Sequence, residues 1–201
     1  MWIVKIGGSW IKNPKLPYLI KLFERFSNQK LIFVLGGGIF ADCVREIFKN
    51  GDMSEETAHT LAVKATEISG LYVGSLNKEI LIIDKIKKIN KKKLNLWLPS
   101  KELFLDDSFE KNWESTSDSI ATWLYSKTES KGLIYIKSLD FNDHRIYKLG
   151  NLQDLGILDL NLQKYLNGKR NLKIIGPKII HFLENSKDWN TLTSKLKRIE
   201  L

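Results

Sequence analysis

Short apolar segments alternate with helical patterns along this chain, and that alternation constrains its fold more than any other feature. Segments such as Trp2–Ile6 are apolar at nearly every position, which is typical of strands buried on both faces of a sheet. The segments between them, for example 16–26, carry apolar residues at three- and four-residue spacing, as helices do. The sequence therefore predicts an α/β fold, a three-layer αβα sandwich around a central, mainly parallel sheet. The expected strands are Trp2–Ile6, Leu31–Leu35, Ile80–Ile83, Leu94–Leu98, Leu133–Lys137 and Asn171–Ile175.

Three of the expected helices carry more detailed predictions. Cys43 lies in an apolar helical stretch over 40–48, so we expect it in the core. Ser54 is suited to cap the next helix, and Ser117 a helix over 118–125, because a hydroxyl can accept a hydrogen bond from a first-turn amide. The side chains expected to face inward in the helix after Ser54 are Leu61, Ala65, Ile68 and Tyr72.

The amino-acid composition limits the classes of protein to which the chain can belong. Hydrophobic residues make up 43% of the 201 residues and charged residues 27%, as in a globular protein, and we expect a single domain over 1–201. The single cysteine excludes an intrachain disulfide and fits a reducing compartment. No segment approaches the ~20 apolar residues that a membrane span needs. We therefore expect a cytoplasmic protein without a membrane partner.

The net charge is +9, from 32 Lys and Arg against 23 Asp and Glu. Such a surplus suits nucleic acid, an anionic membrane or an anionic small ligand. The lysines are spread widely, and the dense run over 87–93 is interpreted as a solvated turn because no nucleic-acid-binding pattern accompanies it. We expect no nucleic-acid partner. With no cluster of Cys and His, no metal-binding side chains are expected either.

Two glycine clusters follow buried strands. Gly7 and Gly8 come before Ser9 after the first strand, and the triplet 36–38 separates the second strand from a helix. In an open parallel sheet, ligands bind beyond the carboxyl ends of the strands. Glycine lets backbone N–H groups approach a phosphate there, and a following helix adds a partly positive N-terminus. Tight turns are the alternative explanation, but two clusters together favour phosphate binding.

Two lysines lie at or near the ends of buried strands. Lys5 interrupts the apolar run WIVKI, and Lys137 closes the run LIYIK. Because burial excludes an unpaired charge, such an ammonium needs a partner or a ligand, although each lysine alone could extend to solvent. Asp118 begins a helix, where an acid suits the helix dipole. It could equally orient both lysines through charge-assisted hydrogen bonds.

Several segments resemble the amino acid kinase superfamily. VKIGGS is similar to its first strand and loop, FVLGGGIFADCVRE to its second glycine loop and helix, STSDSIATWL to its Asp-bearing segment and IYIKSLD to its nucleotide-side strand. A narrower resemblance combines GGGxFADxVR, MSEETAH, LWLP, WESTSDSIATWL, IYIKSLD and LGILD. That combination resembles a short, aspartokinase-like branch of the superfamily, which includes the (aminomethyl)furanmethyl phosphate kinase of methanofuran biosynthesis.

The resemblance implies an ATP-dependent kinase that uses Mg²⁺ and acts on a small anionic molecule. The acceptor implied is a phosphate monoester such as [5-(aminomethyl)furan-3-yl]methyl phosphate, which would become the diphosphate in methanofuran-type C1-carrier biosynthesis. An amino-acid or carbamate kinase that makes an acyl phosphate stays open, as does a non-catalytic nucleotide- or anion-binding protein. The resemblance also implies a homo-oligomer. It implies an acceptor-side half over about 1–115 and a nucleotide-side half over about 116–201.

The resemblance also assigns residue roles. Lys5 and Lys137 would flank the transferred phosphoryl group, with Asp118 holding both. The residues implied to contact the nucleotide are Gly7, Gly8, Ser9, Ser138 and Asp140. The residues implied to bind the acceptor are Gly36, Gly37, Gly38, Asp42, Arg45 and His59. For Asp42 and Arg45 an exposed ion pair within the helix is the alternative, and for His59 a structural role.

Overall fold

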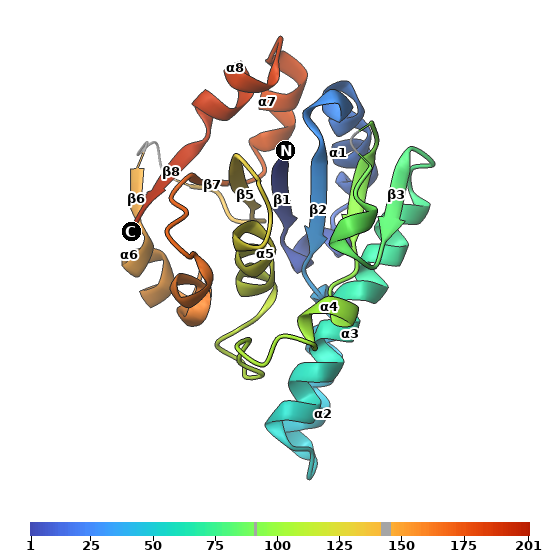
Figure 1. The fold of residues 1–201 in the computed structure, drawn as a ribbon, viewed down its shortest axis with the longest axis vertical. Helices are drawn as coiled ribbons and strands as arrows, with labels where there is room; N and C mark the ends of the chain where they lie inside the picture. The colour runs from blue at the N-terminus through green and yellow to red at the C-terminus, as the bar shows by residue number, and fades with distance from the viewer. Residues whose placement is uncertain (91, 142–145) are drawn as a thin grey trace.

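The computed structural model describes residues 1–90, 92–141 and 146–201 and is built on one eight-stranded sheet (Figure 1). The strand order is β3-β4-β2-β1-β5-β7-β8-β6. All neighbouring strands pair in parallel except β7 and β8, which are antiparallel. The mainly parallel sheet is therefore confirmed. The strands are β1 Trp2–Ile6, β2 Leu31–Leu35, β3 Ile80–Ile83, β4 Leu94–Trp97, β5 Gly132–Ile136, β6 Ile146–Lys148, β7 Leu172–Ile175 and β8 Lys197–Glu200.

Helices cover both faces of the sheet, as the three-layer prediction requires. The α-helices are α1 Leu16–Phe23, α2 Gly38–Asn50, α3 Glu55–Ser75, α4 Ser100–Leu103, α5 Ser117–Ser126, α6 Leu149–Asp154, α7 Ile179–Asn185 and α8 Trp189–Lys195. The 3-10 helices are η1 Gly8–Lys12, η2 Glu24–Gln29, η3 Ile86–Lys88 and η4 Leu160–Tyr165. None of the described helices is long and apolar enough to cross a membrane.

Side-chain alternation along β1 separates two cores. Trp2, Val4 and Ile6 pack with α1, α7 and α8 on one face. Ile3 packs on the other face with α5, α6 and η4. Because successive strand residues point to opposite faces, Lys5 lies on the same face as Ile3 and therefore faces α5. The fold thus directs a charged side chain into the layer that carries Asp118.

The helical pair α2 and α3 projects from one end of the molecule (Figure 1). Ser54 caps α3 as predicted, accepting a hydrogen bond from the Thr57 amide at 3.2 Å. The expected inner face of α3 is wrong except at Ala65: Leu61, Ile68 and Tyr72 are exposed. The inward positions hold mostly small residues, and at Gly70 even a Cβ atom would lie 2.9 Å from Leu96 Cδ2 of β4. The buried residues of α3 are Ala58, His59, Val63, Ala65, Thr66, Ser69, Gly70 and Val73.

The prediction for Cys43 is also wrong. Its side chain is exposed on α2, whose only buried residue is Ala41. An apolar stretch predicts a buried helix only when the fold covers it. Here α2 extends away from the sheet and packs mainly against α3.

Candidate active site

Lys5 and Lys137 meet at the carboxyl ends of neighbouring strands. β1 and β5 pair in register up to Ile6 and Ile136, so Lys137 follows directly at the end of β5. The Nζ atoms of Lys5 and Lys137 each lie 2.6 Å from Asp118, the first from Oδ1 and the second from Oδ2. One carboxylate from the first turn of α5 therefore holds both ammonium groups, as the sequence suggested.

Burial and the neighbouring charges shift the pKa values within this cluster. The Lys5 side chain is 4% exposed, and burial lowers its pKa even though the Asp118 carboxylate opposes that change. Burial alone would raise the pKa of Asp118. The charges of Lys137 and Lys5 and the hydrogen bond from Lys137 outweigh it, so the pKa is lowered. Asp118 is thus held as a carboxylate between two cations.

The two glycine loops touch each other backbone to backbone. A Cβ atom on Gly8 would lie 2.3 Å from the Gly38 nitrogen, and one on Gly36 would lie 2.4 Å from the Gly8 nitrogen. Gly38 also has φ +53°, a conformation that glycine adopts readily. The loops after β1 and β2 therefore form one surface, which only glycine permits.

Backbone donors gather at these loops. The first hydrogen bond within α2 joins the Ala41 amide to the Gly37 carbonyl, so the N–H groups of Gly38, Ile39 and Phe40 precede the helical ladder. Such amides, together with the dipole of a 13-residue helix, attract an anion. The start of α2 is therefore suited to a phosphate group.

A cavity of about 590 Å³ opens over the charge cluster and the glycine loops. It brings together most of the residues singled out in the sequence: Lys5, Gly8, Ser9, Gly36, Gly37, Gly38, Asp42, Arg45, His59, Asp118 and Lys137. Their roles stay predictions.

Three of the residues implied to bind nucleotide lie outside this cavity. The N–H of Gly7 is already used, since it donates to the Ile136 carbonyl at 2.8 Å. Asp140 and Gly176 border a second, smaller hollow of about 90 Å³. Ser138 is exposed and lines neither the cavity nor this hollow. The segment that follows, 142–145, lies outside the described residues.

The outer part of the cavity carries the polar residues of α2. Arg45 Nη1 lies 2.7 Å from Asp42 Oδ1, and the guanidinium lies 5.3 Å from the ring centre of Trp113. At a rise of about 1.5 Å per residue, Arg45 sits roughly 10 Å along α2 from its glycine start. The ion pair expected within the helix is present, and it also borders the cavity.

His59 is 2% exposed and also lines the cavity. Its Nε2 lies 2.8 Å from the Ser115 carbonyl oxygen, and since a carbonyl only accepts, Nε2 carries a proton. Burial lowers the pKa of the ring, which favours the neutral form. The Nδ1 atom is then a hydrogen-bond acceptor, and among the described residues it has no partner.

Sequence reasoning missed other residues at the cavity, above all Asp159. Its carboxylate accepts hydrogen bonds from the Thr116 amide at 2.8 Å and the Ser119 amide at 2.9 Å. The expected cap at Ser117 is wrong: Thr116 is the N-cap residue and makes no side-chain cap. Asp159 closes the LGILD segment, which was the available signal. The further lining residues that sequence reasoning missed include Lys12, Thr66 and Trp113.

The described residues contain no group of three or more His, Cys, Asp and Glu placed to hold a metal ion. Asp118, the carboxylate at the centre of the cluster, already contacts two lysines. A Mg²⁺ ion at this site fits only if phosphate oxygens and water supply most of its ligands, which is common for Mg²⁺.

Comparison with solved structures defines the class to which this fold belongs. The uridylate kinase of Archaeoglobus fulgidus matches with a TM-score of 0.67 at 15% identity, over 92% of this chain and 96% of that one. The UMP kinase of Ureaplasma parvum matches with a TM-score of 0.64 at 19% identity, over 100% of this chain and 98% of that one. The fold is that of the amino acid kinases. No model of a known protein family matches the chain.

A curated relative narrows the class. The [5-(aminomethyl)furan-3-yl]methyl phosphate kinase of Methanocaldococcus jannaschii is 33% identical over 144 residues, which are 70% of this chain and 67% of that one. The chain belongs to the family of that enzyme, within the amino acid kinase superfamily, and is a kinase.

Proposed function

We propose that this kinase transfers the γ-phosphoryl group of ATP to a small phosphate monoester such as [5-(aminomethyl)furan-3-yl]methyl phosphate, giving the diphosphate. The observation that carries this proposal is the pair of ammonium groups, each 2.6 Å from one carboxylate, beside the glycine start of α2. The two ammonium groups lie next to the amides that precede the helical ladder of α2. Together these groups suit the binding of two phosphate groups that must approach each other. The phosphate monoester on which the Methanocaldococcus jannaschii relative acts supports the same acceptor here.

In the proposed reaction an oxygen of the acceptor phosphate attacks the γ-phosphorus of ATP. A new P–O bond forms, the bond to the β–γ bridging oxygen breaks, and ADP leaves with that electron pair. The attacking oxygen is already anionic, so no strong general base is needed. Lys5 and Lys137 would neutralise the charge that spreads over the moving group. Mg²⁺ would supply further neutralisation of the β- and γ-oxygens.

The acceptor would lie along α2. Its phosphate would accept hydrogen bonds from the amides at 38–40, and the rest of the molecule would extend towards Arg45 and Trp113. The ring of His59 would form part of the cavity wall against which the acceptor packs. Asp42 would attract a cationic amine. These assignments favour an acceptor that carries both a phosphate and a hydrogen-bond donor.

On the nucleotide side, Gly8 and Ser9 would donate amides to the β- and γ-phosphates, because both precede the first bond of η1, from Trp10 to Gly7. Asp140 borders the hollow next to the end of β7 and would lie towards the rest of the nucleotide. Gly7 and Ser138 would act through the shape of their loops rather than by lining the cavity.

We also propose that the protein is cytoplasmic and pairs with a second copy of itself. Leu61, Ile68 and Tyr72 are 40%, 48% and 41% exposed and recur seven and four residues apart, so they form one apolar stripe on α3. A long exposed apolar stripe favours association. Sedimentation of the wild type and of Ile68→Glu tests it: a monomer in both would remove the proposal.

The function is tested by measuring ADP release with a panel of phosphate monoesters, amino acids and carbamate. Release that depends on a phosphate monoester, with a hydroxylamine-resistant diphosphate as product, is expected. A hydroxylamine-sensitive product would identify an acyl phosphate and replace the proposed acceptor class. Nucleotide binding without ADP release for any acceptor would remove the catalytic proposal.

A further inference from the structure

We propose that Asp159 is a positioning residue for phosphoryl transfer: it fixes the first turn of α5 and thereby the carboxylate of Asp118. The inference rests on the proposed function only in that Asp118 must hold the two lysines for transfer. Asp159 lies about forty residues further along the chain than the helix it caps, so the constraint exists only in the folded protein.

The contacts of Asp159 bracket Asp118. One carboxylate oxygen accepts the amides of Thr116 and Ser119 at 2.8 and 2.9 Å, and the other accepts the Thr116 hydroxyl at 2.6 Å. α5 begins at Ser117 without a side-chain cap of its own. Asp159 therefore supplies the cap, and it pins the backbone on both sides of Asp118.

Asp159 acts through this turn rather than by direct pairing. Within the described part of the chain it forms no ion pair, whereas both lysines pair with Asp118. The geometry of that pairing is demanding, since both Nζ–Oδ distances are 2.6 Å. A shift of about 1 Å in a positioning group can lower a rate roughly 100-fold.

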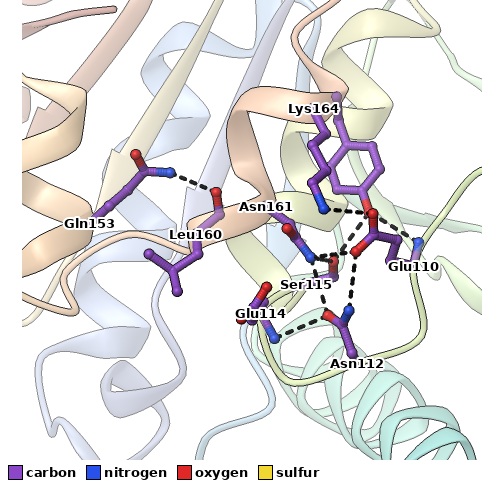
Figure 2. A network of polar contacts seen from close by, with 9 residues as sticks. Glu110, Asn112, Glu114, Ser115, Gln153, Leu160, Asn161 and Lys164 are labelled. Atoms are coloured by element: carbon purple, nitrogen blue, oxygen red, sulfur yellow. Dashed lines mark hydrogen bonds and ion pairs between the residues drawn. The ribbon is translucent and has the colours of Figure 1, made fainter.

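The segment that carries Asp159 is itself anchored (Figure 2). Gln153 donates to the carbonyls of Asp159 and Leu160, both at 2.8 Å. Two residues after Asp159, Asn161 donates to Glu110 at 2.8 Å and to the Ser115 hydroxyl at 3.0 Å. The same segment therefore holds α5 on one side and, on the other, the loop whose Ser115 carbonyl contacts His59.

The experiment compares Asp159→Ala with Asp159→Asn. The alanine removes all three hydrogen bonds. In the asparagine the amide oxygen still accepts both N–H groups, while the amide nitrogen can donate to the Thr116 hydroxyl, which accepts as well as donates. Asp188→Ala is the matched control, because Asp188 caps α8 through the amide and hydroxyl of Thr191 at 2.9 and 2.8 Å, outside the cavity.

We expect kcat of Asp159→Ala to fall about 10- to 100-fold. KM for ATP and for the phosphate monoester should stay within about twofold, because positioning acts on the transition state. Asp159→Asn and Asp188→Ala should keep wild-type kcat. Three results would overturn the proposal: wild-type kcat in Asp159→Ala, equal loss in Asp188→Ala, or equal loss in Asp159→Asn.

Hydrogen exchange separates this proposal from the proposed function, because it needs no acceptor. In Asp159→Ala the amides of 116–120 should exchange faster than in the wild type, and in Asp159→Asn they should not. Unchanged exchange in Asp159→Ala refutes the positioning role. Faster exchange in a protein that releases no ADP with any acceptor refutes only the proposed function.

Discussion

Replacement of Lys5 by methionine would separate what this residue does for stability from what it does for transfer. Methionine has a similar length and no charge, and Lys5 is 3% exposed within an apolar strand. The substitution removes the ion pair to Asp118 at 2.6 Å, but Asp118 keeps its contact with Lys137 at the same distance. No buried carboxylate is left unpaired.

The expected change in the free energy of unfolding follows from the ion pair that remains between Asp118 and Lys137. Leaving a buried charge without a partner costs about 3–5 kcal/mol, whereas exchanging a buried ion pair for apolar groups is often neutral or stabilising by about 1–4 kcal/mol. Lys5→Met lies nearer the second case, because Asp118 keeps Lys137 as its partner. We therefore expect the free energy of unfolding to change by less than about 2 kcal/mol, which is less than about 8 °C in Tm for a chain of this size. Loss of one preorganised charge contact should still lower kcat by roughly 10²–10³.

The assay pairs thermal unfolding with steady-state ADP release at saturating ATP and phosphate monoester. Lys173→Met is the matched control: Lys173 lies in β7, burial lowers its pKa as well, and it does not line the cavity. A folded Lys5→Met with kcat within tenfold of the wild type would refute the role given to this ammonium. Unfolding of Lys5→Met at room temperature would show that Lys5 is needed for the fold.

Three other substitutions test separate parts of the site. Gly8→Ala places a Cβ 2.3 Å from the Gly38 nitrogen, so urea unfolding should show a loss of about 1–3 kcal/mol or more, and an unchanged midpoint would contradict the contact between the loops. Arg45→Ala should raise acceptor KM several-fold while ATP KM stays constant; a change in ATP KM alone would move Arg45 to the nucleotide side. Asp118→Asn leaves the buried Lys5 and the half-buried Lys137 without their carboxylate and should lose about 3–5 kcal/mol at neutral pH. Because the folded pKa of Asp118 is lowered, ionised Asp118 stabilises the wild type above the unfolded pKa of about 3.9, and this contribution disappears as the pH falls through the lower folded value. Urea titrations should therefore show the two proteins converging below about pH 4, and a constant difference down to pH 3 would contradict the lowered pKa.

The central strands could be predicted from sequence because burial on both faces gives continuous apolar runs. The bounds of β1, β2 and β3 agree with the expected ones, and Lys5 and Lys137 stood out because the first interrupts such a run and the second closes one. The edge of the sheet was not predictable in this way. β8 is short, charged at three of its four positions and antiparallel to β7, so it lacks the pattern of a buried strand.

The residues that sequence reasoning placed wrongly or missed depend on distant partners. Leu61 and Ile68 have helical spacing, but the fold turns the small residues of α3 inward and leaves these two outside. Cys43 is exposed because α2 leaves the sheet. Asp159 caps a helix far away in the sequence, and the LGILD segment marks the residue without revealing that contact.

The contact between Gly8 and Gly36 limits how such a site can diversify. The two loops meet through main-chain atoms, so their separation is set by van der Waals contact between the backbones and no side chain there can widen or narrow it. A family built on this arrangement can change which molecule it accepts only further out, along α2 and α3 or the Trp113 loop. The backbone at Gly8 and Gly36 should therefore keep the same geometry whichever acceptor is bound. The residues at the rim of the cavity should vary with the size and charge of the acceptor.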